Sequence, residues 1–180
     1  MLPGKQPGVP AMTPHIRLAE FPEDREAVIG LFSDYVAHLL ERVPDEREAI
    51  ARKYDPAGVA AAVDGFARVH ARPHGALLIA TSGGAPVGCG MMRTQAPGAA
   101  ELQRIFVRPE ARGTGLGRAL TAALMDQARA DGHRVVRLDT GRTMTEVIDF
   151  YASLGFAEVP PYHDETPYLN HTLIFMERPL

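Results

Sequence analysis

The sequence predicts an α/β fold in which a mixed β-sheet is sandwiched between helices. Three observations support this prediction. Apolar residues recur at helical spacing over the first third of the chain, three short apolar runs separated by turn residues follow, and helical and strand-like segments then alternate. Helices on both sides of a run of strands are typical of a layered fold around one sheet.

The first third is expected to hold one strand and two helices. Residues 15–19 alternate as a strand does, and Pro22, followed by two acidic residues, suits the first turn of a helix. That helix is strongly amphipathic, with apolar residues at Val28, Leu31, Phe32, Tyr35, Val36, Leu39, Leu40 and Val43. Asp55 and Pro56 provide a cap and a first position for the second helix. Its inner face carries Val59, Val63, Phe66 and His70.

The middle of the chain is expected to be a three-strand meander followed by a helix. Glycine and proline turns separate the strands, which we place at residues 76–80, 86–94 and 100–107. A helix is predicted from about residue 116 to 130, and Gly132 ends it.

The last part is expected to alternate strand, helix, strand and strand. Residues 135–138 form the first of these strands. Thr143 and Glu146 fit a capping box, which places a helix from Met144 to residue 154, ended by Gly155. The two remaining strands are predicted at residues 156–159 and 171–177.

The composition describes an ordinary globular protein of 180 residues. Residues 1–14 hold four prolines and two glycines and are predicted to be a flexible lead-in, and residues 15–180 a single domain. The formal net charge of −3 gives no electrostatic footprint for nucleic acid or an anionic membrane. No apolar run approaches the roughly 20 residues that span a bilayer. The single cysteine, Cys89, lies in an apolar stretch and is expected to be a buried core residue in a reducing compartment.

A glycine-rich turn between a strand and a helix carries the clearest chemical signal. Residues 104–118 read Arg-Ile-Phe-Val-Arg-Pro-Glu-Ala-Arg-Gly-Thr-Gly-Leu-Gly-Arg, so a strand leads through the turn directly into a helix. Backbone N–H groups converge at a helix start, and the helix dipole makes that end electropositive. Glycines let a phosphate approach these amides, and Arg112 and Arg118 add positive charge. The pattern predicts a pyrophosphate site, with a tightly packed glycine turn as the alternative.

This turn is neither of two common nucleotide-binding motifs. A Walker P-loop would continue with Gly-Lys-Ser or Gly-Lys-Thr, which does not occur here. In a dinucleotide fingerprint that begins at Gly113 and Gly115, the third glycine would fall at position 118, where Arg118 stands.

Two segments resemble the landmarks of the GNAT superfamily of N-acetyltransferases. Arg112-Gly113-Thr114-Gly115-Leu116-Gly117 matches the signature Arg/Gln-x-x-Gly-x-Gly/Ala between a strand and a helix. Residues 150–156, Phe-Tyr-Ala-Ser-Leu-Gly-Phe, match a helix that ends in Tyr-x-x-Leu-Gly-Phe. The order of elements over about residues 15–178 is also similar. The resemblance implies a three-layer fold whose central mixed, mostly antiparallel sheet has six to seven strands flanked by helices.

The resemblance also implies a site for acetyl-CoA as co-substrate, without a metal. Backbone groups of Ile105, Phe106 and Val107 would pair with the pantetheine arm. The pyrophosphate would be held by Arg112, Gly113, Thr114, Gly115, Leu116, Gly117 and Arg118. The family's fourth strand usually bulges and splays from the fifth, and here the alternation through Leu102, Gln103 and Arg104 gives way to a continuous apolar run. Many members carry an asparagine at the position of Met144, so that contact is not carried over.

Two residues are the leading catalytic candidates for acetylating a primary amine of a small molecule or peptide by direct attack. Glu101 lies six residues before Val107, an offset at which some members place a catalytic glutamate that removes the amine proton. Tyr151 matches the tyrosine whose hydroxyl usually faces the cofactor sulfur. The alternatives are a salt-bridged carboxylate and a packed aromatic ring. A histidine or water is left open as the base.

Further residues could build the acceptor pocket, and the acceptor itself is not identified. The candidates are Tyr35, His38, Tyr162, His163, Asp164, Glu165, Tyr168 and His171. The competing functional hypothesis is a non-catalytic acyl-CoA-binding or regulatory domain on the same fold. Homodimers are common among similar proteins, and the sequence leaves the oligomeric state open. A cytoplasmic location is expected from the use of acetyl-CoA and the lack of a targeting signal.

Overall fold

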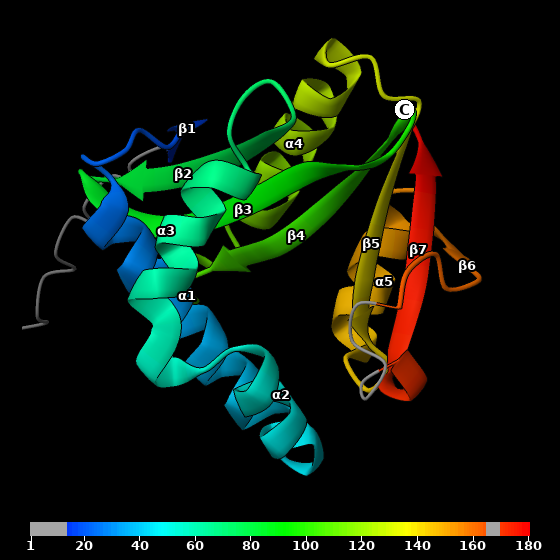
Figure 1. The fold of residues 1–180 in the computed structure, drawn as a ribbon, viewed down its shortest axis with the longest axis horizontal. Helices are drawn as coiled ribbons and strands as arrows, with labels where there is room; N and C mark the ends of the chain where they lie inside the picture. Colours follow the sequence, from blue (N-terminus) through cyan, green and yellow to red (C-terminus); the bar gives the residue numbers. More distant parts are fainter. Residues whose placement is uncertain (1–13, 165–169) are drawn as a thin grey trace, which may run out of the picture.

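The computed structural model describes residues 14–164 and 170–180, which form a seven-stranded sheet with helices on both faces (Figure 1). The predicted lead-in, except for its last residue, lies outside the described residues. The strands are β1 (His15–Leu18), β2 (Gly75–Ser82), β3 (Ala85–Ala96), β4 (Ala99–Val107), β5 (Val135–Gly141), β6 (Ala157–Val159) and β7 (Leu173–Pro179). The α-helices are α1 (Arg25–Arg42), α2 (Arg47–Lys53), α3 (Val59–Val69), α4 (Leu116–Ala130) and α5 (Thr145–Ser153). Short 3-10 helices are η1 (Pro44–Glu46), η2 (Pro56–Gly58), η3 (Pro109–Ala111) and η4 (Asn170–Thr172).

The sheet is mixed and mostly antiparallel, as the resemblance implied. Its strand order is β1-β2-β3-β4-β5-β7-β6, and β4 and β5 are its one parallel pair among the described strands. Parallel neighbours need a crossover, and α4 provides it on one face.

The helices divide into two layers because each buries one apolar face on the sheet. On one face, Val28, Val36 and Phe66 of α1 and α3 pack with Leu77 and Met91 of the meander. On the other face, apolar residues of α4 and α5 join inward-facing residues of β2, β3, β4, β5 and β7 in the largest buried cluster. This confirms the predicted three-layer arrangement. Cys89 is buried on the first face, and burial raises the pKa of its thiol to about 12, so the predicted core role is confirmed.

Several predicted boundaries are wrong. The first helix begins at Arg25 rather than Pro22, and the Asp55 side chain caps η2 by accepting from the Ala57 amide, with α3 following at Val59. Helix α2 was not predicted. The last strand begins at Leu173, because residues 170–172 form η4 instead.

The predicted capping box at Thr143 and Glu146 does not form. Met144 is the N-cap of α5 and makes no side-chain cap hydrogen bond. Glu146 instead accepts a hydrogen bond from Arg42 of α1 at 2.6 Å. The carboxylate that the capping box requires is therefore engaged by another helix. Within the described ranges, no helix is both long and apolar enough to cross a membrane.

Candidate active site

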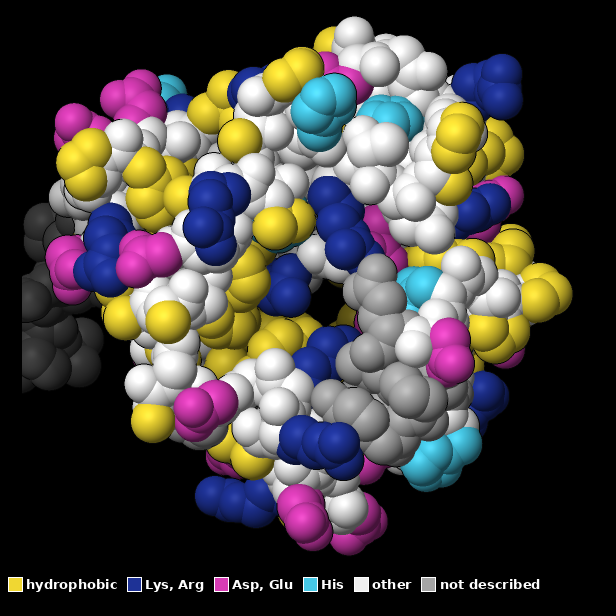
Figure 2. All heavy atoms as spheres, in the orientation of Figure 1, with side chains coloured by type: hydrophobic (Ala, Val, Ile, Leu, Met, Phe, Trp, Pro, Cys, Tyr) yellow, Lys and Arg dark blue, Asp and Glu magenta, His cyan; other side chains and the backbone are white. Residues whose placement is uncertain are grey.

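The site lies where β4 separates from β5. The two strands pair only over Ala99–Glu101, and beyond this point they diverge. A pocket of about 760 Å³ opens there, lined by α1, β4, the start of α4, β5 and α5. On the face drawn in Figure 2 the surface is hollowed, and Lys and Arg side chains gather around the opening.

A β-bulge in β4 shapes this pocket, as the resemblance implied. Phe106 lies opposite Cys89 and Gln103 opposite Met91, so two residues of β4 face one residue of β3. Arg104 sits inside the bulge with a φ of 51°, the only positive φ among the described non-glycine residues. The bulge and the splay leave the later part of β4 without a strand partner on the side of β5.

The glycine turn forms one end of the pocket and has room for a ligand. Gly113 and Gly115 have φ values of 75° and 85°, which favour glycine. A Cβ atom built on either residue would meet no protein atom within 4 Å, so the space beside their backbone is open. Gly115 is the N-cap of α4, and no side chain caps the amides of the first turn. These amides are therefore available to an anion such as a pyrophosphate.

The other predicted donor-site residues surround this turn. Arg112 Nε donates to the Val107 carbonyl at 2.9 Å, and Arg118 donates to the Ser153 hydroxyl at 3.1 Å. Thr114 does not line the pocket, since its hydroxyl donates to the Ala111 carbonyl at 2.7 Å. The remaining predicted residues do line it, namely Ile105, Phe106, Val107, Arg112, Gly113, Gly115, Leu116, Gly117 and Arg118.

Glu101 lies at the other end of the pocket, 1% exposed. Its Oε2 accepts hydrogen bonds from Arg93 at 2.9 Å and Gln103 at 2.5 Å, and its Oε1 accepts one from the Tyr162 hydroxyl at 3.1 Å. Burial and the Glu101 charge raise the pKa of Tyr162, which therefore stays protonated as a donor. The Glu101 carboxylate therefore forms the salt bridge expected of a structural residue and also lines the pocket, as expected of a catalytic one.

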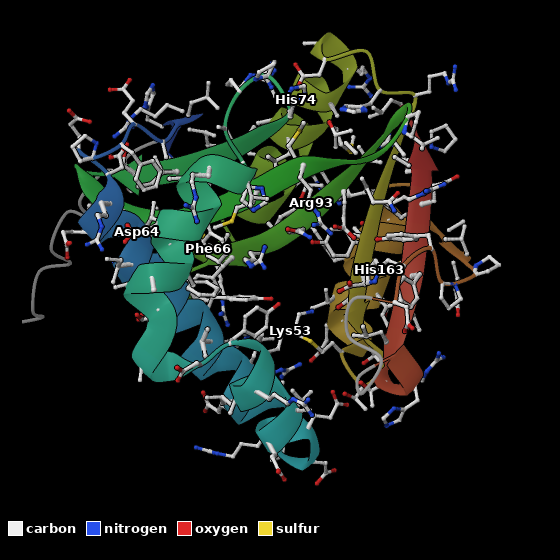
Figure 3. All side chains as sticks on the ribbon, in the orientation of Figure 1. Lys53, Asp64, Phe66, His74, Arg93 and His163 are labelled. Carbon is white, nitrogen blue, oxygen red and sulfur yellow. The ribbon has the colours of Figure 1, made fainter. Side chains whose placement is uncertain are left out.

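His163 and Asp139 complete a cluster around Glu101. His163 Nε2 lies 3.1 Å from Asp139 Oδ2 and 3.4 Å from Glu101 Oε1. Burial alone would raise the pKa of Asp139, but the hydrogen bond from His163 and the charge of Lys53 outweigh it, so the pKa is lowered and Asp139 is ionised. The side chains of Arg93, Lys53 and His163 come from different elements around this space (Figure 3). Sequence reasoning missed Asp139, although it is an inward-facing acidic residue on the strand beside Glu101.

This cluster has enough ligand atoms for a metal ion, but a hydrogen-bond network suits it better. One atom each of Glu101, Asp139 and His163 lie within 4.8 Å of one another. However, Arg93 and Gln103 already occupy Glu101 Oε2, and a guanidinium beside a metal cation would be repelled. The three groups therefore form a hydrogen-bonded cluster of titratable side chains in the wall of the pocket.

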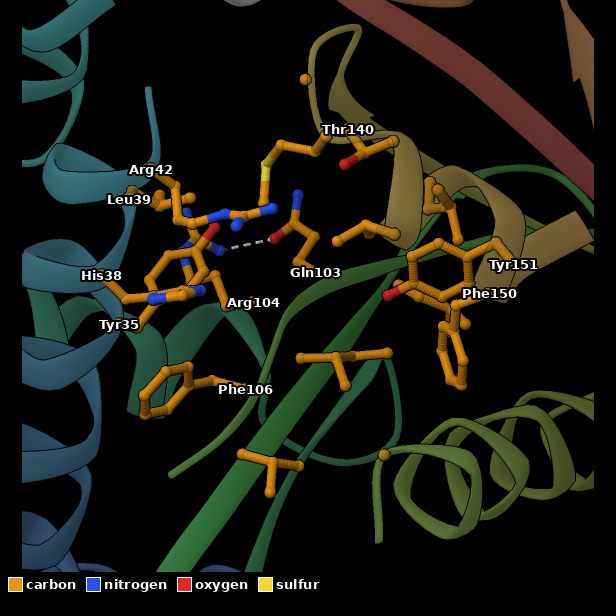
Figure 4. A pocket seen from close by; sticks show the side chains of 18 of the residues that line it. Tyr35, His38, Leu39, Arg42, Gln103, Arg104, Phe106, Thr140, Phe150 and Tyr151 are labelled. Carbon is orange, nitrogen blue, oxygen red and sulfur yellow. Dashed lines mark hydrogen bonds between the residues drawn. The ribbon is translucent and has the colours of Figure 1, made fainter. Parts of the chain in front are cut away.

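The Tyr151 hydroxyl faces the pocket across from Gln103 (Figure 4). The ring is buried and packs edge-on against Phe150 and Phe156, with centroids 5.1 and 5.5 Å away. Burial and the charge of Asp139 raise the pKa of Tyr151, so the hydroxyl keeps its proton. The described part of the chain offers this hydroxyl no hydrogen-bond partner, so the ring packs and the hydroxyl remains available to a ligand.

The remaining sequence candidates separate into three groups. Tyr35, His38 and His163 line the pocket, while Tyr162 reaches it through Glu101. Asp164 and His171 are exposed and do not line it. Glu165 and Tyr168 lie outside the described residues. Sequence reasoning missed Lys53 and Arg104, since neither a short unpredicted helix nor a bulge side chain could be placed from periodicity.

Comparisons of the sequence with known proteins all point to acetyltransferases. The sequence profile described as the Acetyltransferase (GNAT) family matches residues 32–156. An "IAA acetyltransferase" of Azospirillum brasilense is 37% identical over 111 residues, which cover 61% of this chain and 71% of the relative. An uncharacterised N-acetyltransferase of Schizosaccharomyces pombe is 28% identical over 171 residues, 91% of this chain and 95% of the relative.

A solved structure shares the fold. The PaiA N-acetyltransferase of Thermoplasma acidophilum, determined in complex with coenzyme A, aligns with a TM-score of 0.71 at 19% identity. The alignment covers 94% of this chain and all of the other.

Proposed function

This chain belongs to the acetyltransferase (GNAT) family, and on that basis we propose that it transfers the acetyl group of acetyl-CoA to a primary amine of a small molecule or peptide. One observation carries the proposal. A single pocket runs from the open glycine turn at the start of α4 to the buried cluster of Glu101, Asp139 and His163. A donor held at the turn would therefore present its acyl end near groups that can accept and give protons.

The donor would be held mainly by backbone groups. The amides from Gly113 to Arg118 would receive the pyrophosphate, since the helix dipole and the open glycine backbone favour an anion there. Ile105 to Val107 would pair with the pantetheine arm along the unpaired edge of β4. Arg112 already donates to the Val107 carbonyl. That oxygen would accept a hydrogen bond from the pantetheine arm either with its second lone pair or in place of the bond from Arg112.

The acceptor must lose a proton before it can attack the acetyl carbon. A lysine-like amine has a pKa of about 10.4, so about 1 in 2,500 molecules is neutral at pH 7. We assign proton removal to the Glu101–His163–Asp139 cluster, directly or through a water. Once the His163 imidazole has taken the proton, the carboxylates of Glu101 and Asp139 beside it would stabilise its positive charge and hold the ring in place.

The coenzyme leaves as a thiolate and needs a proton in return. Tyr151 is assigned this role because its protonated hydroxyl faces the pocket without another partner among the described residues. No covalent bond to the enzyme is needed in this direct attack, so the chain supplies positioning and proton transfer.

The test is thiol release from acetyl-CoA across a panel of amino acids, amines, polyamines and peptides, with mass spectrometry of the products. We expect at least one amine to give an acetylated product together with an equal amount of free coenzyme A. Retained acetyl-CoA binding without turnover of any panel member would instead favour a non-catalytic acyl-CoA-binding domain.

A further inference from the structure

Arg104 occupies an unusual position at the acceptor end of the pocket. It lies in the β4 bulge at a positive φ, a conformation that few non-glycine residues adopt. Its guanidinium lies over the ring of Phe66, with the two centres 4.5 Å apart, and 5.8 Å from the ring of Tyr54. Aromatic faces stabilise a cation and fix its plane. The bulge therefore holds this guanidinium in one place in the wall of the pocket.

Arg104 makes no ion-pair contact with a described residue, although the charge of Asp139 acts on it from a distance. Nη1 donates to the neutral Gln103 amide oxygen at 2.7 Å, and Nε is buried without a hydrogen-bond partner. Lys53 also lines the pocket, lies over the Tyr54 ring at 5.3 Å, and makes no ion pair with a described residue. The nearby charge of Asp139 favours the charged form of Lys53, but neither Arg104 nor Lys53 is in contact with a described carboxylate, so a ligand carboxylate would find donors available on both.

The acidic groups of the pocket are mostly engaged elsewhere. Glu101 is paired with Arg93, Asp139 with His163, and Glu146 with Arg42. The fourth, Glu46, forms no ion pair with Arg104 or Lys53. The acceptor end therefore offers two cations, consistent with the Lys and Arg side chains around the hollow in Figure 2.

We infer that the acceptor carries a carboxylate close to its amine, as a free amino acid does, and that Arg104 and Lys53 bind this carboxylate. The inference rests on the proposed function and names its substrate class. A guanidinium can hold a carboxylate with two parallel hydrogen bonds, and an ammonium adds a point charge. A cationic polyamine would be repelled by the same pair of side chains.

The geometry also links the carboxylate site to the proton-transfer cluster. Arg104 donates to Gln103 (Figure 4), and Gln103 in turn donates to Glu101 at 2.5 Å. A carboxylate bound at Arg104 thus lies one side chain away from the group that would receive the amine proton. This spacing favours an amine and a carboxylate on one small molecule over a peptide, whose terminal amine and carboxylate lie far apart.

The test compares free L-amino acids with their carboxamides, which keep the amine and remove the negative charge. With the wild type we expect kcat/KM for the favoured acid to exceed that for its amide by at least about tenfold, as for a lost charge-assisted contact. Arg104→Gln and Lys53→Met should each reduce this ratio to about threefold or less, mainly by raising KM for the acid. Arg47→Met is the matched control, because Arg47 is an exposed cation of α2 outside the pocket and should leave the ratio unchanged.

Peptides that end in the favoured amino acid test whether the carboxylate belongs to a free amino acid or to the C-terminus of a peptide. Preferred turnover of amides, of polyamines or of such peptides by the wild type would overturn the inference, as would an unchanged ratio in Lys53→Met. If no amine is acetylated, the proposed function fails, and calorimetry of the same acid and amide pairs with coenzyme A-loaded protein decides the inference separately. Tighter binding of an acid than of its amide would support it, and no binding of any acid would overturn it.

Discussion

At the residue scale, the proposed mechanism requires Tyr151, as the acid, to protonate the departing thiolate. An ordinary thiol has a pKa near 8.5 and tyrosine near 10, so proton donation is uphill by about 2 kcal/mol in water. Burial and Asp139 raise the pKa of Tyr151 further, but a thiolate released into the same partly apolar pocket also becomes more basic. The shared environment thus limits the mismatch and keeps Tyr151 protonated over the neutral range.

Tyr151→Phe keeps the ring in its packed position and removes only the hydroxyl. We expect kcat to fall at least about tenfold, with acetyl-CoA affinity and thermal stability nearly unchanged, because the hydroxyl has no partner to lose among the described residues. Steady-state kinetics, with calorimetry for the donor, measure both quantities. Wild-type kcat, with chemistry shown to be rate-limiting, would leave Tyr151 as a packing residue.

Glu101 and His163 are predicted to act as a unit in removing the amine proton. Glu101→Gln and His163→Gln should each lower kcat/KM by about 10²–10⁴-fold at pH 7, the range expected for a positioned acid or base. Each deficit should shrink as the pH rises, because the solution then supplies more neutral amine. The pH profile of kcat/KM for the two variants measures this.

The double variant separates one proton-transfer unit from two independent roles. If the two residues share one proton path, losing both costs about as much as losing the more severe one alone. Multiplicative losses would show that the 3.4 Å contact between His163 and Glu101 is not part of the mechanism.

At the scale of elements, local signals predicted α4 best. Its observed bounds match the predicted ones because both of its ends are marked by glycines within a few residues. The start of α5 was predicted within one residue, but its capping box was not, since the Glu146 carboxylate bonds Arg42, which is distant in the sequence. Helix α2 buries only Ile50, so its sequence lacks the apolar stripe by which helices are recognised.

The junction of α3 and β2 carries a pH-dependent contribution to stability. His70 caps α3 and is 3% exposed, and its Nδ1 donates to the Met92 carbonyl at 2.9 Å while Nε2 is buried without a partner. Burial lowers the pKa of His70 from 6.5 to about 4, because protonation would place an unpaired charge in the core.

The folded protein therefore binds this proton more weakly than the unfolded chain does. The contribution of His70 is fully present above pH 6.5 and is lost as the pH falls toward about 4, by at most about 3 kcal/mol. Urea unfolding between pH 4 and 7 should show a shallower pH dependence for His70→Gln than for the wild type. His74→Gln, at an exposed position in the same loop, should retain the wild-type slope, and equal slopes for all three proteins would contradict the assignment.

At the scale of the whole molecule, the site forms because distant segments meet where the sheet opens. Motifs at residues 112–118 and 150–156 predicted which residues line the proposed donor end of the pocket, since each motif is a short continuous segment. The proposed acceptor end brings together Lys53, Arg104, Asp139 and His163 from four separate segments of the chain. No local sequence pattern predicts that these residues lie close together. Even Glu101, which was predicted from its position in one strand, pairs with Arg93 of β3 and contacts His163 in the loop after β6.

A matched pair of glycines at the two ends of α4 allows a test of donor binding that needs no knowledge of the acceptor. Gly115 and Gly132 have φ values of 85° and 81°, and a Cβ atom on either meets no protein atom within 4 Å. Replacing either with alanine should therefore cost a similar backbone strain of about 1–2 kcal/mol. Only Gly115 lines the pocket.

Calorimetric titration of acetyl-CoA into the wild type, Gly115→Ala and Gly132→Ala tests most directly whether the pocket is a donor site. The account predicts that the wild type and Gly132→Ala bind acetyl-CoA equally, while the methyl group of Gly115→Ala weakens binding by at least about tenfold. Circular dichroism of both variants verifies that they fold. A wild type that does not bind acetyl-CoA, or a folded Gly115→Ala that binds it with wild-type affinity, would contradict the account.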